Sequence, residues 1–192
     1  MFENIRADFM CEYGSKAGSR FTNYLQWLLL DYGLQALVIY RFGRWLNYAP
    51  KHSLVWFITP FLYPLYWLMS AWTRNAYGID LDQSADIGPG FHIFHFGGIE
   101  VRNCRIGSHC NILQQVKLGS AKTTDKTLVI GERVYIGAHA RIYADVTIGD
   151  GVTIGPGAVV TEDIPPYCLV LGNPGRIIQR DYDNSTLLWV PF

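Results

Sequence analysis

Aliphatic side chains recur at every sixth position along the second half of the chain. The clearest run is unbroken and comprises Ile130, Ile136, Ile142, Ile148, Ile154 and Val160. Two earlier series keep the same spacing and are separated by a shift of one residue: Ile87, Ile93 and Ile99, then Ile106, Ile112 and Leu118. A period of six fits neither an α-helix nor a two-sided strand, but it is the period of a hexapeptide β-helix.

A second line of small or apolar residues lies two positions before each of these aliphatic residues. It comprises Ala85, Phe91, Gly97, Cys104, Cys110, Val116, Leu128, Val134, Ala140, Val146, Val152 and Ala158. Each hexad therefore directs two side chains inward. Three hexads complete one triangular coil, which buries its apolar face only by stacking on its neighbours. We predict a mainly β fold: a left-handed parallel β-helix of hexapeptide repeats with an N-terminal α-helical segment.

The N-terminal part of the chain has a different composition, with five of the six tryptophans before Gly78. Residues 54–72 carry no charge, although Pro60 and Pro64 within them predict a kinked or broken helix. Three interpretations are open: a helical cap that packs in an oligomer, helices lying in a membrane interface, or a membrane span, which the prolines disfavour. We divide the chain into an aromatic-rich helical region (1–77), a β-helix (78–178) with an arm at about 120–127, and a C-terminal tail (179–192).

Charge and cysteine content restrict the partners and the compartment. The 16 basic and 16 acidic residues balance to zero net charge, which argues against nucleic acid as a partner. None of the four cysteines forms a CxxC pair, and Cys104 and Cys110 lie on the inward line of the repeat. We therefore expect no disulfide framework and no zinc site. The first residues lack the pattern of a secretory signal, so we expect a cytoplasmic protein.

His95 is the strongest candidate for a catalytic base among the five histidines. It falls at a corner of the prism, where parallel prisms meet in a symmetric oligomer. A count of eighteen residues per coil places Asp80 beside this corner and Gln114 beneath His95. A carboxylate that orients an imidazole suits general-base catalysis, whereas the alternative is a surface histidine with an acid nearby by chance. His92 is expected to point outward from the middle of a face.

Six segments between residues 77 and 178 carry a family resemblance. They are YGID with Asp80, IGPGFHIFH with His95, NILQQVKLG, VYIGAHARI, VTIGPGAVV and IPPYCLVLGNPGRII. Together they resemble the hexapeptide-repeat acetyltransferases, most closely the serine O-acetyltransferase branch. The resemblance covers just over half of the chain, and it rests on the combination, since any single hexad is a weak signal.

The resemblance implies a mechanism and a set of site residues. His95 would be the general base supported by Asp80, and a backbone N–H near Gly119 would stabilise the oxyanion. Acetyl-CoA would be the co-substrate, bound in the groove between the subunits of a homotrimer, with the arm beside it and no metal. The implied cofactor-binding residues are Gly119, Ser120, Lys122, Ala138, Pro156 and Arg176.

Two departures from the family concern the acceptor. Phe94 stands where serine acetyltransferases carry an aspartate, and Lys126-Thr127 stands where they carry an arginine-histidine pair. Those groups bind the charged ends of an amino acid, whereas a phenyl ring suits the face of a sugar. We therefore interpret the chain as an acetyl-CoA-dependent O-acetyltransferase acting on a saccharide hydroxyl. We expect Phe94, Gln114 and His92 to bind this sugar or glycolipid acceptor.

The short aromatic N-terminal region is similar to that of sugar O-acetyltransferases associated with exopolysaccharide synthesis. On this basis we expect the acceptor to be an exopolysaccharide or lipid-linked sugar precursor. We also expect the N-terminal helices to make a peripheral contact with the inner face of the plasma membrane. The alternatives are a serine O-acetyltransferase of cysteine biosynthesis and a β-helix scaffold without enzymatic activity.

Overall fold

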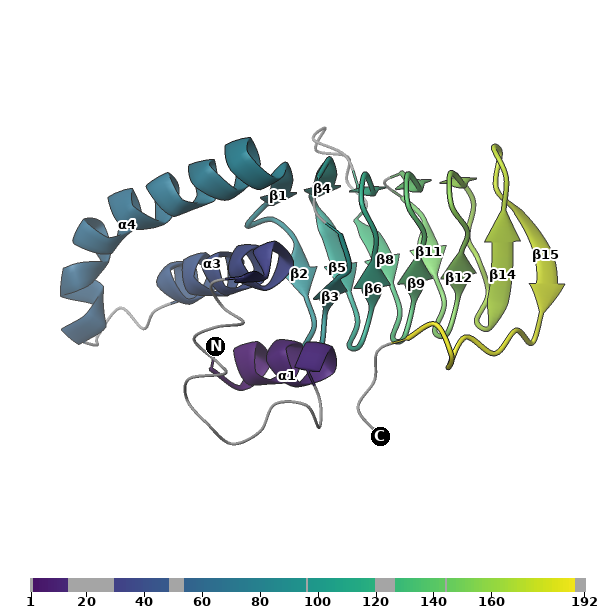
Figure 1. The fold of residues 1–192 in the computed structure, drawn as a ribbon, viewed down its shortest axis with the longest axis horizontal. Helices are drawn as coiled ribbons and strands as arrows, with labels where there is room; N and C mark the ends of the chain where they lie inside the picture. The colour runs from purple at the N-terminus through teal and green to yellow at the C-terminus, as the bar shows by residue number, and fades with distance from the viewer. Residues whose placement is uncertain are drawn as a thin grey trace.

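A column of short strands forms the larger part of the computed structural model, and the described helices gather at its N-terminal end (Figure 1). The structure describes residues 2–13, 30–48, 54–95, 97–119, 127–143 and 145–188. The helices are α1 (Phe2–Tyr13), α3 (Tyr32–Tyr48) and α4 (Leu54–Trp72), which continues into a π-helical turn, η2 (Thr73–Tyr77).

The strands form three sheets, one along each face of the column. Sheet A contains β1 (Ile79–Leu81), β4 (Ile99–Val101), β7 (Lys117–Leu118), β10 (Arg141–Ile142) and β13 (Val159–Val160). Sheet B contains β2 (Asp86–Ile87), β5 (Cys104–Ile106), β8 (Leu128–Ile130) and β11 (Thr147–Ile148). Sheet C contains β3 (His92–Ile93), β6 (Asn111–Ile112), β9 (Tyr135–Ile136), β12 (Thr153–Ile154), β14 (Cys168–Leu171) and β15 (Arg176–Arg180).

From β1 to β13, consecutive strands belong to different sheets, so the chain passes around the column once every three strands. Neighbouring strands within a sheet pair in parallel, except for β14 and β15, which are antiparallel. The predicted parallel β-helix of hexapeptide repeats with N-terminal helices is therefore confirmed. Strand β15 crosses the boundary predicted at residue 178 between the β-helix and the tail.

The repeat residues fill the interior of the column. Ile99, Ile136 and Val152 have no exposed surface, and Cys110 on the second inward line has none either. Backbone hydrogen bonds join successive coils; for example, the N–H of Gly131 donates to the carbonyl of Ile148 at 2.8 Å. Since each coil satisfies its backbone groups through the next one, burial and hydrogen bonding both depend on stacking.

The coils differ in length, contrary to the constant spacing of eighteen residues. Arg141 does pair with Val159, eighteen positions later, but Ile79 pairs with Ile99, twenty positions later. The first coil is longer because the corner between β3 and β4 contains five residues, 94–98. This difference changes the expected position of Asp80.

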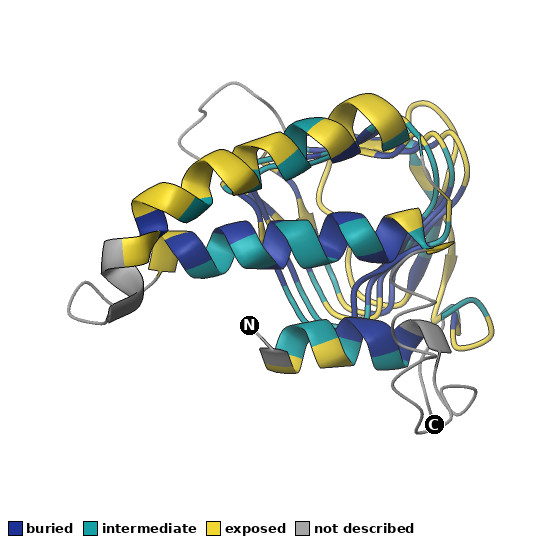
Figure 2. Ribbon diagram, turned by 60° about the vertical axis from the view of Figure 1, so that its left-hand side comes forward, coloured by how far each residue is buried: buried dark blue, intermediate teal, exposed yellow. Residues whose placement is uncertain are grey.

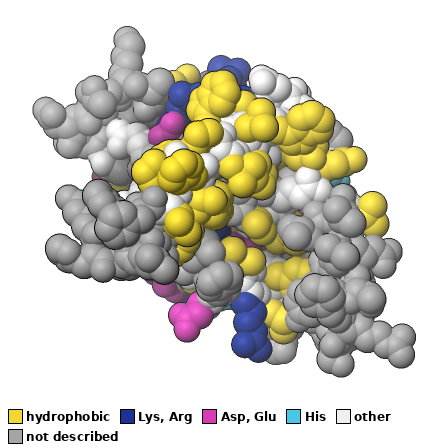
Figure 3. All heavy atoms as spheres, turned by 90° about the vertical axis from the view of Figure 1, so that its left-hand side faces the viewer, with side chains coloured by type: hydrophobic (Ala, Val, Ile, Leu, Met, Phe, Trp, Pro, Cys, Tyr) yellow, Lys and Arg dark blue, Asp and Glu magenta, His cyan; other side chains and the backbone are white. Residues whose placement is uncertain are grey.

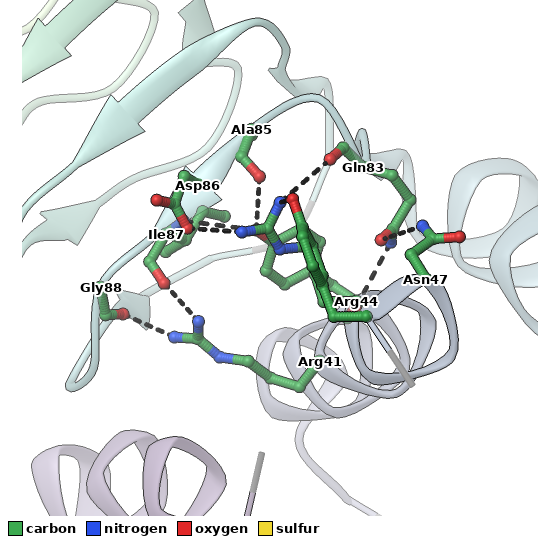
Figure 4. A network of polar contacts seen from close by, with 10 residues as sticks. Arg41, Arg44, Asn47, Gln83, Ala85, Asp86, Ile87 and Gly88 are labelled. Carbon is green, nitrogen blue, oxygen red and sulfur yellow. Dashed lines mark hydrogen bonds and ion pairs between the residues drawn. The ribbon is translucent and has the colours of Figure 1, made fainter. Parts of the chain in front are cut away.

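Helix α3 attaches the helical region to the first coil. Its Tyr40 binds the carbonyl of Ala85, its Arg41 binds the carbonyls of Ile87 and Gly88, and its Arg44 binds the carboxylate of Asp86 (Figure 4). Ala36, Leu37 and Tyr40 also belong to the buried cluster formed by the repeat residues. Of the three interpretations of the N-terminal region, α3 matches the helical cap.

A buried ion pair fixes α1 to the same junction. Nε of Arg41 lies 3.1 Å from Oδ2 of Asp8, and the two side chains are 5% and 1% exposed. Asp8 also accepts a hydrogen bond from the N–H of Phe91 at 3.1 Å. Burial raises the pKa of the Asp8 carboxyl, and the positive charge of Arg41 opposes that rise. The sequence contains no periodic signal for this pair.

Helix α4 forms an outer layer on α3 and η2. It continues through Pro60 and Pro64 without a break and bends along its length (Figure 1), so of the two expected outcomes the bent helix is the one found. Both prolines lie on exposed positions, where water can bind the carbonyls that lose their N–H donors. The outer face is exposed and apolar, with Phe61 81% and Trp67 67% exposed (Figure 2). Within the described ranges, no helix is long and apolar enough to cross a bilayer.

Candidate active site

His95 lies at the corner between β3 of sheet C and β4 of sheet A, and it is exposed. Strand register places the corners of successive coils above one another, because His92 pairs with Asn111, Asn111 with Tyr135, and Tyr135 with Thr153. Three residues beyond each paired position, the same corner holds His95, Gln114, Ala138 and Pro156. We call these four residues the corner column.

The corner column offers an open strip of small side chains. Ala138 is half-buried and Pro156 is exposed. An added Cβ at the neighbouring Gly157 would have no atom within 4 Å, so the surface there is open. Oε1 of Gln114 is buried and has no hydrogen-bond partner among the described residues. An unsatisfied buried acceptor is costly, so this corner suits a ligand that donates a hydrogen bond.

Asp80 lies on the outer side of sheet A, between the buried residues Ile79 and Leu81. A spacing of eighteen residues would place Asp80 next to Gly98. Asp80 instead pairs with Glu100, and Gly78 is the residue next to Gly98, so the expected position of Asp80 is wrong. The carboxylate of Asp80 forms an ion pair with the guanidinium of Arg102. Asp80 is therefore bound by a cation on the sheet adjoining the His95 corner.

His92 points outward from sheet C but is only 4% exposed, because α3 and α1 cover strand β3. The α3 backbone comes so close that an added Cβ at Gly33 would lie 2.8 Å from the carbonyl oxygen of Ile93. Burial lowers the pKa of His92 to about 4, and the charge of Asp31 opposes this only in part. Its ring packs edge-on against Phe94 at a centroid distance of 4.3 Å. His92 thus supports Phe94 from beneath the helices and offers no exposed surface to an acceptor.

Gly119 lies beyond the other end of sheet A, five residues after Gln114 of the corner column. Five extended residues span roughly 16 Å, so one chain does not bring Gly119 to His95. The N–H of Gly119 donates to the carbonyl of Ile142 at 3.0 Å and is not free to bind an oxyanion. Ser120, Lys122 and the arm up to residue 126 lie outside the described residues.

Arg176 begins β15, at the far end of the column from the helices. Its guanidinium lies 3.6 Å from the carboxylate of Glu162, and both side chains are mostly exposed. Such exposed pairs contribute little, so Arg176 is free to bind another anion.

A second polar feature, which was not predicted from the sequence, lies on the outer side of sheet A. A hollow of about 350 Å³ is lined by Glu100, Arg102, Lys117, Leu118, Gly119, Arg141, Ile142 and Tyr143, and we call it the charged pocket. Register places Glu100, Lys117 and Arg141 side by side on adjacent strands. These charged residues stand at outward repeat positions in the sequence. The arm between β7 and β8 interrupts the repeat, so the pairing of Lys117 with Arg141 could not be predicted from the spacing alone.

The described residues contain no group of three or more side chains suited to hold a metal ion. The four cysteines are free thiols, and burial raises the pKa of Cys104 and of Cys110 to about 12. Neither of these thiols is a nucleophile near neutral pH. The chemistry of the site therefore depends on His95 and the polar groups near it.

Comparison with known proteins agrees with this architecture. Residues 127–162 match the family described as "Bacterial transferase hexapeptide (six repeats)". A serine acetyltransferase of Synechococcus elongatus is 33% identical over 183 residues, which are 94% of this chain and 70% of the relative. The crystal structure of a Vibrio cholerae serine acetyltransferase has a TM-score of 0.74 and 30% identity, over 93% of this chain and 66% of that one. A Brucella abortus serine acetyltransferase in complex with coenzyme A has a TM-score of 0.72 and 25% identity, over 92% and 67%.

The β-helix with its exposed corner histidine therefore defines a hexapeptide-repeat transferase. More narrowly, the chain belongs to the serine acetyltransferase family, and it spans about two thirds of the length of the relatives named above. The predicted enzyme class and acetyl-CoA as co-substrate are confirmed at the level of the family.

The predicted sugar acceptor is wrong, and so is the exopolysaccharide character assigned to the N-terminal region. Each relative named above is a serine acetyltransferase, and the similarity extends over the N-terminal helices as well as the β-helix. The error came from giving decisive weight to two departures, Phe94 and Lys126-Thr127, and to the aromatic N-terminal region. A single apolar residue in the acceptor region does not determine the substrate when charged groups from other strands lie nearby.

Proposed function

We propose that this chain transfers the acetyl group of acetyl-CoA to the hydroxyl of serine. The proposal is carried by the similarity to serine acetyltransferases over 94% of the chain. It is supported by the position of His95, which is exposed at one end of the corner column and therefore accessible to two substrates at once.

His95 acts as the general base in this proposal. Its neutral imidazole takes the proton of the serine hydroxyl while the hydroxyl oxygen bonds to the carbonyl carbon of the thioester. The C–S bond then breaks, and His95 returns the proton to the departing sulfur. The products are O-acetylserine and coenzyme A, and the base leaves the cycle unchanged. A positioned base of this kind contributes about 10²- to 10⁴-fold to the rate.

The remaining predicted residues have positioning roles in the proposal. Ala138 and Pro156 lie along the same corner as His95, and their small side chains leave room for the pantetheine arm of acetyl-CoA. Arg176, with its exposed guanidinium, is assigned to a phosphate group, as are Ser120 and Lys122. Phe94 and Gln114 adjoin His95 on the acceptor side.

Asp80 supports the base in this proposal, but its carboxylate is shared with Arg102. A carboxylate that accepts a hydrogen bond from a guanidinium has fewer lone pairs left for a second partner. Arg102 therefore limits how strongly Asp80 holds the imidazolium that forms during the reaction. The family resemblance did not predict the positive charge of Arg102 beside Asp80.

We also propose that the active form is a homotrimer in the cytoplasm. A single chain leaves the corner column open and separates Gly119 from His95, whereas the meeting of two prism corners would enclose the substrates between subunits. Native mass spectrometry tests this assembly: a mass three times that of the chain is expected, and a monomer with full activity contradicts it.

The outer face of α4 supports a proposed peripheral contact with the cytoplasmic face of a membrane. Hydrophobic side chains gather on this side of the molecule (Figure 3), and they include Phe61, Trp67, Leu68 and Trp72. No charge interrupts the helix, and the exposed Arg74 follows it, as suits an anionic surface. Flotation with anionic vesicles tests the contact: loss of vesicle binding in Trp67→Ser supports it, and no binding by the native chain contradicts it.

The acetyl-transfer proposal is tested by measuring thiol release from acetyl-CoA with serine, threonine and a panel of sugars. We expect release to depend on serine and to fall about 10²- to 10⁴-fold in His95→Ala. The matched control is His139→Ala, which removes another exposed histidine. Release that serine does not increase, or that is unchanged in His95→Ala, contradicts the proposal.

A further inference from the structure

The charged pocket contains more positive than negative charge. Nζ of Lys117 lies 2.6 Å from the carboxylate of Glu100, and both side chains are almost half exposed. Arg102 is paired with Asp80. Arg141, on the next strand, is exposed and has no carboxylate partner among the described residues. One cation beside the pocket therefore remains available for an anion.

Arg102 provides a second unsatisfied donor. Its Nε is buried and has no hydrogen-bond partner among the described residues, even though its terminal nitrogen binds Asp80. A buried N–H without an acceptor destabilises the protein. A carboxylate that enters the pocket would give this region an acceptor as well as a counter-charge.

The pocket also contains a carboxylate that can exchange its partner. The pair between Glu100 and Lys117 is exposed to water, and pairs of this kind contribute little to stability. Replacing the ammonium group of Lys117 by that of a ligand therefore costs little. Glu100 and Arg141 lie two strands apart, about 10 Å, with Lys117 on the strand between them. An amino acid spans this gap when its ammonium group binds Glu100 and its carboxylate binds Arg141.

The size of the pocket selects among ligands. Its volume of about 350 Å³ is near the lower end of the ~300–1,000 Å³ range of small-molecule sites. A small metabolite fits this space better than the whole of coenzyme A. Phe94, at the predicted acceptor position, supplies no charge, so the charged ends of an amino acid need partners elsewhere.

We propose that the charged pocket binds the charged ends of the amino-acid acceptor, with Arg141 binding its carboxylate and Glu100 its ammonium group. This inference rests on the proposed function and extends it, because it names specificity-determining residues that the corner column does not contain. Arg102 supports the carboxylate. Because a single chain keeps the Gly119 end of this pocket away from its own His95, the hydroxyl of the acceptor faces the base of a neighbouring subunit in the proposed trimer.

Steady-state kinetics of Arg141→Ala and Glu100→Gln test the inference, with serine and acetyl-CoA varied separately. Arg105→Ala is the matched control, because Arg105 is exposed on β5 of sheet B. We expect KM for serine to rise roughly 10- to 100-fold in both pocket variants, with KM for acetyl-CoA unchanged. Arg141→Lys should recover part of the affinity, and circular dichroism checks that each variant folds.

Serine amide adds a test of the carboxylate contact. The native chain should prefer serine to serine amide, and Arg141→Ala should lose most of that preference. A raised KM for acetyl-CoA with unchanged KM for serine would instead assign the pocket to a cofactor phosphate and overturn the inference. Unchanged constants for both substrates overturn it as well. A native chain that does not acetylate serine at all refutes the proposed function itself, which is a different outcome.

Discussion

Replacing Gly119 by alanine tests how closely the coils of the column approach each other. Gly119 has a φ of 76°, and an added Cβ would lie 1.9 Å from the carbonyl oxygen of Arg102. Gly157 has a similar φ of 69°, but its added Cβ would have no atom within 4 Å. The pair of variants therefore separates backbone strain from steric overlap.

The expected magnitudes follow from these two contributions. The left-handed backbone conformation costs an alanine about 1–2 kcal/mol at either position. The overlap with backbone at Gly119 adds about 1–3 kcal/mol, as overpacking does elsewhere. We expect Gly157→Ala to lower the free energy of unfolding by about 1–2 kcal/mol and Gly119→Ala by about 2–5 kcal/mol.

Urea unfolding followed by far-UV circular dichroism, at one fixed protein concentration, measures both variants. Equal losses of stability would refute the reasoning, because the close approach to Arg102 would then contribute nothing. A larger loss at Gly157 would refute it more strongly. The activity of Gly119→Ala is informative too, because Gly119 lines the charged pocket.

Two further predictions concern buried charge and pH. Asp8→Ala leaves the buried Arg41 without its partner and should cost about 3–5 kcal/mol of unfolding free energy, whereas Asp86→Ala, at an exposed pair on the same junction, should cost less than about 1 kcal/mol. Equal costs in urea titrations contradict the role assigned to burial. His92 has a pKa lowered to about 4, so the unfolded chain binds a proton that the native chain does not. Stability should therefore fall by up to roughly 3 kcal/mol as the pH drops from about 6.5 to about 4. His92→Gln should reduce this slope and His139→Gln should not; the same slope in all three proteins contradicts the prediction.

The sequence was sufficient to predict the β-helix because one physical requirement repeats in it. Every strand needs an inward aliphatic residue, and positions such as Ile130 and Ile136 on consecutive strands record that need at a fixed spacing. The same logic placed His95 at a corner with Gln114 beneath it, since local register is set within a few residues. Ala138 and Pro156, which only the family resemblance implied, lie on the same edge.

Other features depended on contacts that have no period. The ion pair between Asp8 and Arg41 joins residues 33 positions apart in separate helices, and the covering of His92 depends on where α3 docks. The position of Asp80 was wrong because the corner at residues 94–98 makes the first coil longer than eighteen residues. The charged pocket was missed because Glu100 and Arg141 come together only through strand pairing.

The acceptor was predicted wrongly for a related reason. Phe94 and Lys126-Thr127 were taken as the determinants of substrate class, although an acceptor is held by all the groups that line its site. The structure places Glu100, Arg102 and Arg141 on the sheet that begins at the His95 corner. Charges contributed by separate coils are not visible in any one motif.

The most direct test of the account is to identify the product formed from [¹³C]acetyl-CoA and L-serine by NMR. We predict O-acetylserine with the native chain, formed about 10²- to 10⁴-fold more slowly by His95→Ala, while calorimetry shows that this variant still binds coenzyme A. Acetate in place of O-acetylserine, or the ester formed at the native rate without the His95 imidazole, would contradict the central claim.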